Sequence, residues 1–375
     1  MRAHAPGALE SPARMQVQCR SMNAFLLRCL LWLRFHRLMR FLNRRRAIVL
    51  AYHGFTDRPA GPGMQNGQGK HVHVDAFRAT MAYVKRHYRV TSLEELVSRY
   101  RSGAPIPDYT IAVTIDDGFE SNYTLAFPVL RELQIPATIF VATDFVDRRR
   151  PLWSDRIEYA LDTTTGSTLS VTIGGQRLSY DISRRDGKVA CDSDLRTRLK
   201  RLPQEGRDAV VDECERQMGV VAPAVDELPA IYRPLTWAQI REMRQSGLVA
   251  IGSHTLSHVI VTRCGPERAQ DELRRSRQLI EERIGAACRL FCYPNGQLGC
   301  FDERTKTWLQ QAGYLCGITT VYGMNDQKAD VFELKRLYTH GLADETRTVM
   351  TLAGVVGLLD RAKRALRRPP ARARV

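Results

Sequence analysis

The sequence lacks several features that would place it in a familiar class of protein. It contains no run of eighteen uncharged apolar residues, which excludes an ordinary membrane-spanning helix. It has no G-x-S-x-G nucleophile elbow and no P-loop, so neither of these hydrolase classes is indicated. Its nine cysteines lack the spacing of a disulfide framework or a zinc knuckle, and an odd number leaves at least one unpaired. We therefore expect a reducing compartment.

The body of the chain also lacks a surplus of positive charge, although the formal net charge of the 375 residues is +16. Residues 1–46 hold ten arginines against one acid, and residues 361–375 hold six arginines and one lysine with no acid. The two ends therefore account for the whole surplus. A neutral body without a nucleic-acid-binding motif indicates no nucleic-acid partner. Basic ends suit an anionic lipid surface, or they only aid solubility.

Residues 24–46 read "AFLLRCLLWLRFHRLMRFLNRRR" and combine apolar and basic residues. Leucine, tryptophan and phenylalanine dominate, while Arg28, Arg34, Arg37 and Arg40 recur at roughly helical intervals. This pattern predicts a basic amphipathic helix that lies on a membrane surface. The alternatives are a helix packed on the domain and an atypical signal anchor. A signal peptide fits poorly, because Arg28 interrupts the apolar stretch and no small-residue cleavage site follows.

From residue 47 onward, short apolar runs alternate with helix-like segments, as in a parallel sheet whose strands are buried on both faces. Strands are predicted at residues 47–53, 109–116, 136–143, 248–254, 288–294, 314–320 and 334–339. Helices are predicted at residues 74–88, 122–134, 236–247, 266–285 and 302–313, with a capping box between Thr236 and Gln239. This alternation predicts an α/β fold, a parallel barrel whose active site lies at the C-terminal ends of its strands.

Two regions fall outside this alternation. Residues 147–232 are polar and charged, and they predict an inserted cap made of helices and a small hairpin. Residues 345–366 are predicted to form a final helix before a basic disordered tail. The predicted organisation is thus a basic segment at 1–46, a barrel domain at 47–345 with its insertion, and a C-terminal helix and tail at 346–375.

The residues with the clearest chemical meaning follow two of the predicted strands. Asp116 and Asp117 end one strand, and His254 and His258 follow another. The strand pattern stops at Gly118, which lets both aspartates face one site. One carboxylate and two imidazoles form an open set of ligands for a divalent metal ion, and the second aspartate remains free to accept a proton. Each pair alone is usually structural, but together they favour a metal-dependent hydrolase.

These motifs resemble those of the NodB-like polysaccharide deacetylases, carbohydrate esterase family 4. The family pattern T-[FI]-D-D is present at residues 114–117, and H-[ST]-x-x-H is present at residues 254–258. The resemblance covers roughly residues 47–340, apart from the insertion. It implies a distorted parallel (β/α)7 barrel with an inserted cap region.

The resemblance also implies roles for the four residues of the two motifs. Asp116 corresponds to the family's general base, and Asp117, His254 and His258 correspond to its metal ligands. The implied cofactor is a divalent ion, zinc in the first instance, with cobalt or nickel as alternatives.

The third family motif, R-x-P-Y-G, is degenerate here and reads "CYPNG" at residues 292–296. Cys292 stands where the family has the arginine that orients the base. Asn295 replaces a tyrosine whose backbone N–H is directed at the oxyanion, a role that Asn295 can still fill. Arg336 is the candidate replacement for the lost arginine, with structural packing as the alternative. We group Arg336 with Pro294 as predicted substrate-binding residues.

Two histidines are further candidates for the chemistry. The family's last motif, L-x-H, supplies a histidine that protonates the leaving amine, but here the run from Leu337 to His340 is one residue longer. His340 is predicted to act as that acid, with a place on the surface as the alternative. His53 ends the first predicted strand and should point at the barrel mouth, where we expect a substrate or catalytic contact rather than a core or loop role.

The predicted function is a metal-dependent hydrolase that removes N-acetyl groups from the amino sugars of a surface polysaccharide or of its lipid-linked precursor. The alternatives are an amidohydrolase that acts on a small non-sugar amide, and a non-catalytic carbohydrate-binding protein. The expected partners are an N-acetylated or lipid-linked glycan and an anionic membrane surface. Unpaired cysteines favour a cytoplasmic location peripheral to the inner membrane, whereas many family members are extracellular, so a periplasmic or membrane-anchored location is the alternative.

Overall fold

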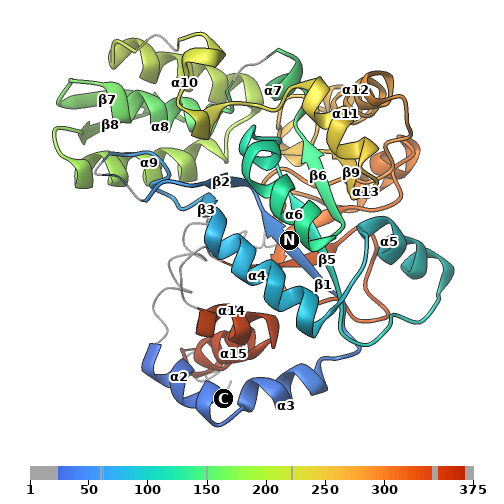
Figure 1. The fold of residues 1–375 in the computed structure, drawn as a ribbon. Helices are drawn as coiled ribbons and strands as arrows, with labels where there is room; N and C mark the ends of the chain where they lie inside the picture. Colours follow the sequence, from blue (N-terminus) through green and yellow to red (C-terminus); the bar gives the residue numbers. More distant parts are fainter. Residues whose placement is uncertain are drawn as a thin grey trace, which may run out of the picture.

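A parallel sheet forms the centre of the computed structural model, which describes residues 24–59, 61, 63–148, 151–220, 223–339 and 345–367 (Figure 1). Within these residues the sheet has seven strands in the order β10–β11–β1–β5–β6–β9, and β4 pairs with β5 outside this path. The strands are β1 Ile48–Tyr52, β4 Arg89–Val90, β5 Thr110–Ile115, β6 Ala137–Val141, β9 Val249–Ser253, β10 Ile318–Tyr322 and β11 Leu334–Tyr338. Strands β1, β5 and β6 are buried along their whole length, which explains their continuous apolar sequences.

Two loop residues connect the edges of this sheet. Phe291 forms a parallel bridge with Ser253 of β9, and Cys292 forms one with Ile318 of β10. The pairing therefore runs around a ring, in agreement with the predicted distorted (β/α)7 barrel. The prediction of a strand at 288–294 is wrong, because in the described chain the pairing is limited to these two residues. Pro294, which follows shortly, has no N–H to continue a ladder.

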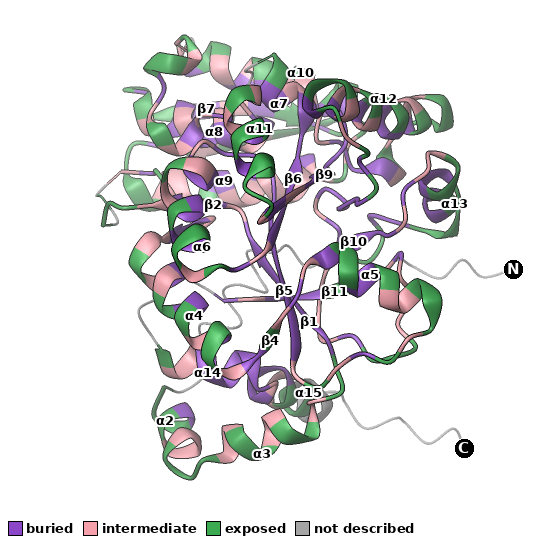
Figure 2. Cartoon of the chain, turned by 45° about the vertical axis from the view of Figure 1, so that its right-hand side comes forward, coloured by how far each residue is buried: buried purple, intermediate pink, exposed green. Residues whose placement is uncertain are grey.

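Helices surround the sheet, with their exposed faces outward and the buried strands inside (Figure 2). They are α4 Val74–His87, α5 Leu93–Ser102, α6 Phe127–Leu133, α7 Thr143–Asp147, α11 Trp237–Gln245, α12 Pro266–Ile284 and α13 Glu303–Gln311. The capping box of Thr236 and Gln239 is confirmed at the start of α11. The helix predicted at 122–134 begins instead as a π-helical turn, η1 Asn122–Ala126. The proline at the start of α6 has no N–H for a regular helical bond.

Several short elements were not predicted, and one strand is shifted. The helix α5, the strand β4 and the small parallel pair β2 Gly54–Thr56 and β3 His71–His73 lie outside all the predicted segments. The strand predicted at 314–320 begins only at Ile318. A short 3-10 turn, η4 Val261–Arg263, lies between β9 and α12. Such short pairs leave too weak a periodicity in the sequence to be recognised.

The inserted region has a hydrophobic core of its own. It contains α8 Trp153–Thr163, the hairpin of β7 Thr168–Ile173 and β8 Gln176–Asp181, α9 Arg185–Leu199, α10 Gln204–Gln217, and the 3-10 turns η2 Val225–Glu227 and η3 Ala230–Tyr232. Ile157, Leu169, Leu195 and Val211 belong to this separate cluster of buried side chains. In Figure 1 the region lies at the upper end of the molecule, above β2 and β3.

The N-terminal and C-terminal helices pack together at the lower end of the molecule (Figure 1). They are α2 Ala24–Trp32, α3 Phe35–Leu42, α14 Glu345–Leu352 and α15 Val355–Arg367. Leu27 of α2 is only 1% exposed and belongs to a cluster with Met350 and Val356. One face of the N-terminal segment is therefore packed on the domain. None of the described helices is both long enough and apolar enough to cross a bilayer.

Two terminal predictions need correction. The single helix predicted over residues 24–46 is broken into α2 and α3 by Arg34, which has a left-handed φ of 58°. The single helix predicted over 345–366 is interrupted at Gly354, which has a φ of +86°. Glycine adopts this conformation without the steric penalty of a Cβ atom, so the helix ends there and a second one begins.

Candidate active site

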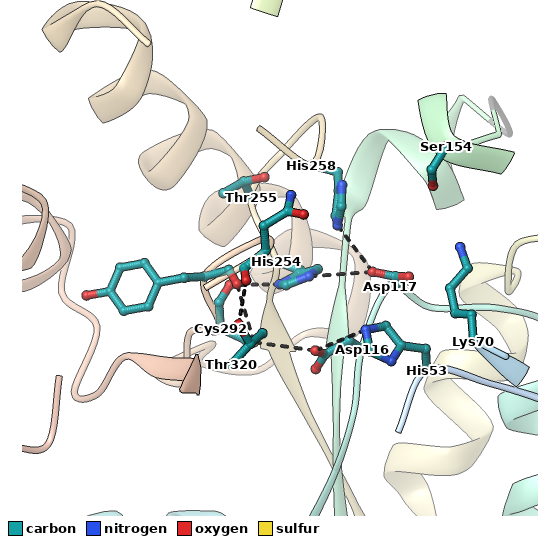
Figure 3. Close-up of polar contacts among 12 residues, drawn as sticks. His53, Lys70, Asp116, Asp117, Ser154, His254, Thr255, His258, Cys292 and Thr320 are labelled. Atoms are coloured by element: carbon teal, nitrogen blue, oxygen red, sulfur yellow. Dashed lines mark hydrogen bonds and ion pairs between the residues drawn. The ribbon is translucent and has the colours of Figure 1, made fainter. Parts of the chain in front are cut away.

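The predicted site residues lie just beyond the C-terminal ends of three strands of the barrel, as a parallel barrel requires (Figure 3). His53 follows β1, Asp116 and Asp117 follow β5, and His254 follows β9. Asp117 has a φ of 75° and Gly118 a φ of 92°. This left-handed turn interrupts the alternation of the strand, so two consecutive carboxylates both reach the mouth of the barrel.

The structure brings Asp117, His254 and His258 together around one point. The Oδ1 atom of Asp117 lies 3.5 Å from Nε2 of His254 and 3.3 Å from Nε2 of His258. The three ligand atoms lie within 4.8 Å of one another. Asp117 Oδ1 is buried and has no hydrogen-bond partner among the described residues. A buried carboxylate oxygen without a partner costs free energy, and a bound cation at this point would offset that cost.

The tautomer of His254 supports the same conclusion. Nδ1 of His254 lies 2.7 Å from the carbonyl oxygen of Cys292, which can only accept, so Nδ1 donates the proton. The other nitrogen, Nε2, therefore presents a lone pair to the carboxylate of Asp117. Burial lowers the pKa of His254 to about 4, although Asp116 acts in the opposite direction. The lone pair of His254 Nε2 and the carboxylate of Asp117 repel each other when nothing lies between them. A divalent ion between them would be coordinated by both.

Asp116 is held by Arg336 in a two-pronged ion pair. Arg336 Nη1 donates to Oδ1 at 2.8 Å, and Nη2 donates to Oδ2 at 2.7 Å. Arg336 Nε also donates to the carbonyl oxygen of Thr319 at 2.7 Å. Burial alone would raise the pKa of Asp116, but the charge and hydrogen bonds of Arg336 outweigh it and hold this pKa below its ordinary value.

Arg336 is 0% exposed, so the prediction that it binds substrate is wrong. Its contacts with Asp116 match the other expectation, in which it stands in for the arginine missing from the third motif. Cys292, at the position of that arginine, has its Sγ 3.7 Å from Asp116 Oδ2. That Arg336 orients a catalytic base stays a prediction.

His53 lies on the open side of Asp116. Its Nε2 is 3.8 Å from Asp116 Oδ2, and its side chain is 27% exposed (Figure 3). Burial lowers the pKa of His53, against the pull of Asp117 and Asp116. The side-chain amide of Asn122, in the π-helical turn, donates to the backbone carbonyl of His53 at 2.7 Å and fixes the backbone there. The predicted contact of His53 with a substrate stays a prediction.

The loop of residues 292–296 lies against β10. Thr320 Oγ1 donates to the carbonyl oxygen of Asn295 at 2.5 Å, and Asn295 has a left-handed φ of 60°. The side-chain nitrogen of Asn295 is buried and has no hydrogen-bond partner among the described residues. Pro294 is buried. The predicted roles of Asn295 and Pro294 stay predictions, and His340 lies outside the described residues.

Two charged residues near the site had no signal in the sequence. Glu272 of α12 accepts hydrogen bonds from the backbone N–H groups of Leu256 and Ser257 at 3.0 and 2.9 Å, so it holds the loop between the two histidines. Lys70 forms an ion pair with Asp155 of the inserted region at 2.5 Å. Glu272 and Lys70 each contact residues that lie far from them in the sequence, and the spacing of these pairs resembles no known motif.

Fold and site together define a class: a parallel α/β barrel with an Asp–His–His group that could hold a metal ion, beside a buried aspartate. The polysaccharide deacetylase family matches residues 104–317, more than half of the chain, and the chain belongs to this family. The predicted resemblance is thereby confirmed.

Relatives and solved structures agree with this membership. The poly-beta-1,6-N-acetyl-D-glucosamine N-deacetylase of Escherichia coli (strain K12) is 28% identical over 101 residues, which are 27% of this chain and 14% of that protein. This chain thus matches only a small part of that relative. The Streptococcus pyogenes deacetylase PplD, solved in complex with acetate, superposes with a TM-score of 0.53 at 16% identity, over 82% of this chain and 98% of that chain. IcaB from Ammonifex degensii superposes with a TM-score of 0.52 at 19% identity, over 82% of this chain and 97% of that chain. These two structures support the fold.

Proposed function

We propose that this protein is a divalent-metal-dependent N-deacetylase of an amino-sugar polysaccharide. The observation that carries the proposal is the convergence of Asp117, His254 and His258 beside an aspartate that is held ionised by Arg336. Membership of the polysaccharide deacetylase family supports the reaction class. The reaction adds water to the acetamido carbonyl carbon, breaks the C–N bond, and releases acetate and a free amine.

The site residues divide the work between them. A divalent ion held by Asp117, His254 and His258, zinc in the first instance and cobalt or nickel otherwise, would supply Lewis-acid activation of water and of the acetamido carbonyl. Asp116 takes the proton from the attacking water as general base. Arg336 keeps the Asp116 carboxylate ionised and in one orientation, since both of its oxygens are engaged.

Two further groups act on the carbonyl oxygen and on the leaving nitrogen. The backbone N–H of Asn295 donates a hydrogen bond to the developing oxyanion. The amine nitrogen takes up a proton from a histidine. His53 is the candidate among the described residues, because its Nε2 lies 3.8 Å from Asp116 Oδ2 and its side chain is partly exposed. His340 is the second candidate from the sequence.

For the substrate we propose β-1,6-linked N-acetylglucosamine chains or a related surface polysaccharide, either free or as a lipid-linked precursor. The support is the substrate named for the Escherichia coli relative. The ion pair of Lys70 with Asp155 joins the inserted region to the mouth of the barrel, so a sugar chain that enters the site would pass beside this region.

The test combines metal content with acetate release. We expect about one zinc, cobalt or nickel ion per purified chain, and acetate release from oligomers of β-1,6-linked N-acetylglucosamine. The variant with both His254→Ala and His258→Ala should lose the ion. Asp116→Asn should keep the ion and lose activity by about 100-fold or more.

The same measurements separate the alternatives. A wild-type protein that binds the oligomer but neither holds nor takes up metal would be a carbohydrate-binding protein. Acetate release from a small non-sugar amide, with none from the oligomer, would indicate an amidohydrolase. Full activity in Asp116→Asn would contradict the proposed mechanism.

A further inference from the structure

Exposed apolar side chains are concentrated on the N-terminal helices. Of the nine large hydrophobic residues that are exposed in the described chain, seven belong to residues 24–42. Trp32 is 83% exposed and Phe25 is 73% exposed. Clusters of this kind on a folded surface indicate a contact with a membrane or another molecule. The helix α2 is attached to the domain by its opposite side, through the buried Leu27. The exposed apolar side chains therefore do not contribute to this attachment.

The same helices carry basic residues and no acid. Arg28, Arg34, Arg37, Arg45 and Arg46 are all exposed, and residues 24–46 contain neither aspartate nor glutamate. A partner that accepts both exposed tryptophan and several arginines must offer an apolar layer beside a negatively charged one. An anionic phospholipid surface has this arrangement, with acyl chains beneath a layer of phosphates.

A pocket between α3, α4 and α14 adds a site for a single phosphate. Its volume is about 420 Å³, and its lining includes His36, Arg37, Arg40, Tyr83, His87 and Glu345. Two arginines and two histidines face only one carboxylate there. Nδ1 of His36 is buried and has no hydrogen-bond partner among the described residues.

Arg37 and Arg40 oppose a positive charge on the two histidines of this pocket. Burial, followed by the charges of Arg37 and Arg40, lowers the pKa of His36, and burial together with Arg40 lowers the pKa of His87. An anion bound between these side chains would relieve the repulsion and give Nδ1 of His36 a partner. A phosphate group has the charge and the acceptor oxygens for this.

We propose that the outer face of α2 and α3 docks on an anionic phospholipid bilayer, with Trp32 and its apolar neighbours in the headgroup layer and a lipid phosphate in the pocket of His36, Arg37 and Arg40. The contact is peripheral, since the helices are short and lie on the surface of the domain. It is independent of the proposed deacetylase activity.

Flotation of the full chain with lipid vesicles tests the proposal. One set of vesicles is phosphatidylcholine alone, and the other has a third of its lipid replaced by phosphatidylglycerol. We expect binding to the second set only, and weakening as salt rises. Trp32→Ser should weaken binding by about tenfold. Arg37→Glu, which reverses a charge at the pocket, should weaken it by about tenfold or more.

Matched variants away from this face give the controls. Leu298 is also exposed, at 68%, and Arg216 is an exposed arginine of α10. Leu298→Ser and Arg216→Glu should bind vesicles as the wild type does. Circular dichroism and the Tm establish that every variant is folded, and neither depends on the lipid contact.

Three results would overturn the proposal. The first is equal binding to neutral and anionic vesicles. The second is a dimer, seen by analytical ultracentrifugation, that Trp32→Ser dissociates while vesicle binding is absent, because a second copy of the chain would then cover the face. The third is tight binding of inorganic phosphate without any binding of anionic vesicles, because the pocket would then serve a free anion.

Discussion

At the scale of single residues, the ion pair of Arg336 and Asp116 controls the charge of the Asp116 carboxylate. A buried carboxylate without compensation would take up a proton and could not act as a base at neutral pH. Here both oxygens receive hydrogen bonds from one guanidinium, which is itself fixed by the carbonyl oxygen of Thr319. The arginine comes from β11, far along the chain from the third motif, where the family has its own.

The variant Arg336→Gln tests this residue. We expect activity to fall by about 100-fold, and the free energy of unfolding to fall by about 3–5 kcal/mol, because a buried charge loses its partner. Without Arg336, burial dominates and the pKa of Asp116 rises, so the base becomes protonated at a higher pH. The acidic limb of the pH–activity profile should therefore move to higher pH.

Arg336→Lys is the matched control for this variant. It keeps the charge but loses the two-pronged geometry, so the acidic limb should move less than in Arg336→Gln. An acidic limb that stays in place in Arg336→Gln, with activity lost only through instability, would mean that the arginine has a packing role.

At the scale of elements, the loop after β9 depends on a helix that supplies no ligand. Glu272 of α12 accepts two backbone hydrogen bonds and one from the Ser257 hydroxyl at 2.6 Å, all from the segment between the two histidines. The loop has little regular structure of its own, and His258 has a φ of 55°. Its conformation is therefore held from outside.

Glu272→Gln should loosen this loop and weaken metal binding. Removal of groups that orient a ligand typically costs 10–100-fold in affinity, and we expect about tenfold here, because the amide retains one acceptor. Isothermal titration with zinc measures the effect. Glu267→Gln, on an exposed position of the same helix, should bind zinc like the wild type. Equal affinities for the two variants would contradict a positioning role for Glu272.

The packing of α2 on the C-terminal helices depends on one buried side chain. Leu27 is 1% exposed in the cluster with Met350, whereas its neighbour Leu26 is 41% exposed. Leu27→Ala should lower the free energy of local unfolding of α2 by about 2–3 kcal/mol, through lost burial and a residual cavity. Leu26→Ala should leave it nearly unchanged.

Hydrogen exchange of the amides of α2 measures this difference directly. If the two alanine variants exchange alike, the packing of α2 on α14 and α15 does not hold the helix in place.

At the scale of the whole molecule, metal binding and stability should be linked. A ligand that binds only the folded state stabilises it, by about 2.7 kcal/mol when its concentration is 100 times its Kd. Addition of a chelator should therefore lower the Tm of the wild type by several degrees, and zinc should restore it. The variant with both His254→Ala and His258→Ala should not respond. If neither the chelator nor zinc changes the Tm of the wild type, the protein has no metal centre that stabilises the fold.

The sequence predicted those parts of the fold and site that depend on local patterns. The strand ends, the paired aspartates and the two histidines lie in short motifs, and the structure brings these residues together. Arg336 could only be suggested, because its contact with Asp116 joins residues 220 positions apart. Glu272 gave no signal at all. The predicted strand at 288–294 failed because apolar composition does not show that only two residues pair with their neighbours.

The two ends of the barrel give the molecule a polarity. The residues of the candidate active site follow the C-terminal ends of the strands, whereas α3 ends shortly before β1 begins, so α2 and α3 lie at the opposite end (Figure 1). With these helices resting on a bilayer, the opening would point away from the lipid, and the reacting sugar would sit at least the length of a six-residue strand, about 20 Å, above it. The distance between the bilayer and the opening would then select which sugars react. On a membrane-anchored chain, sugars next to the anchor would keep their acetyl groups, and those farther out would lose them.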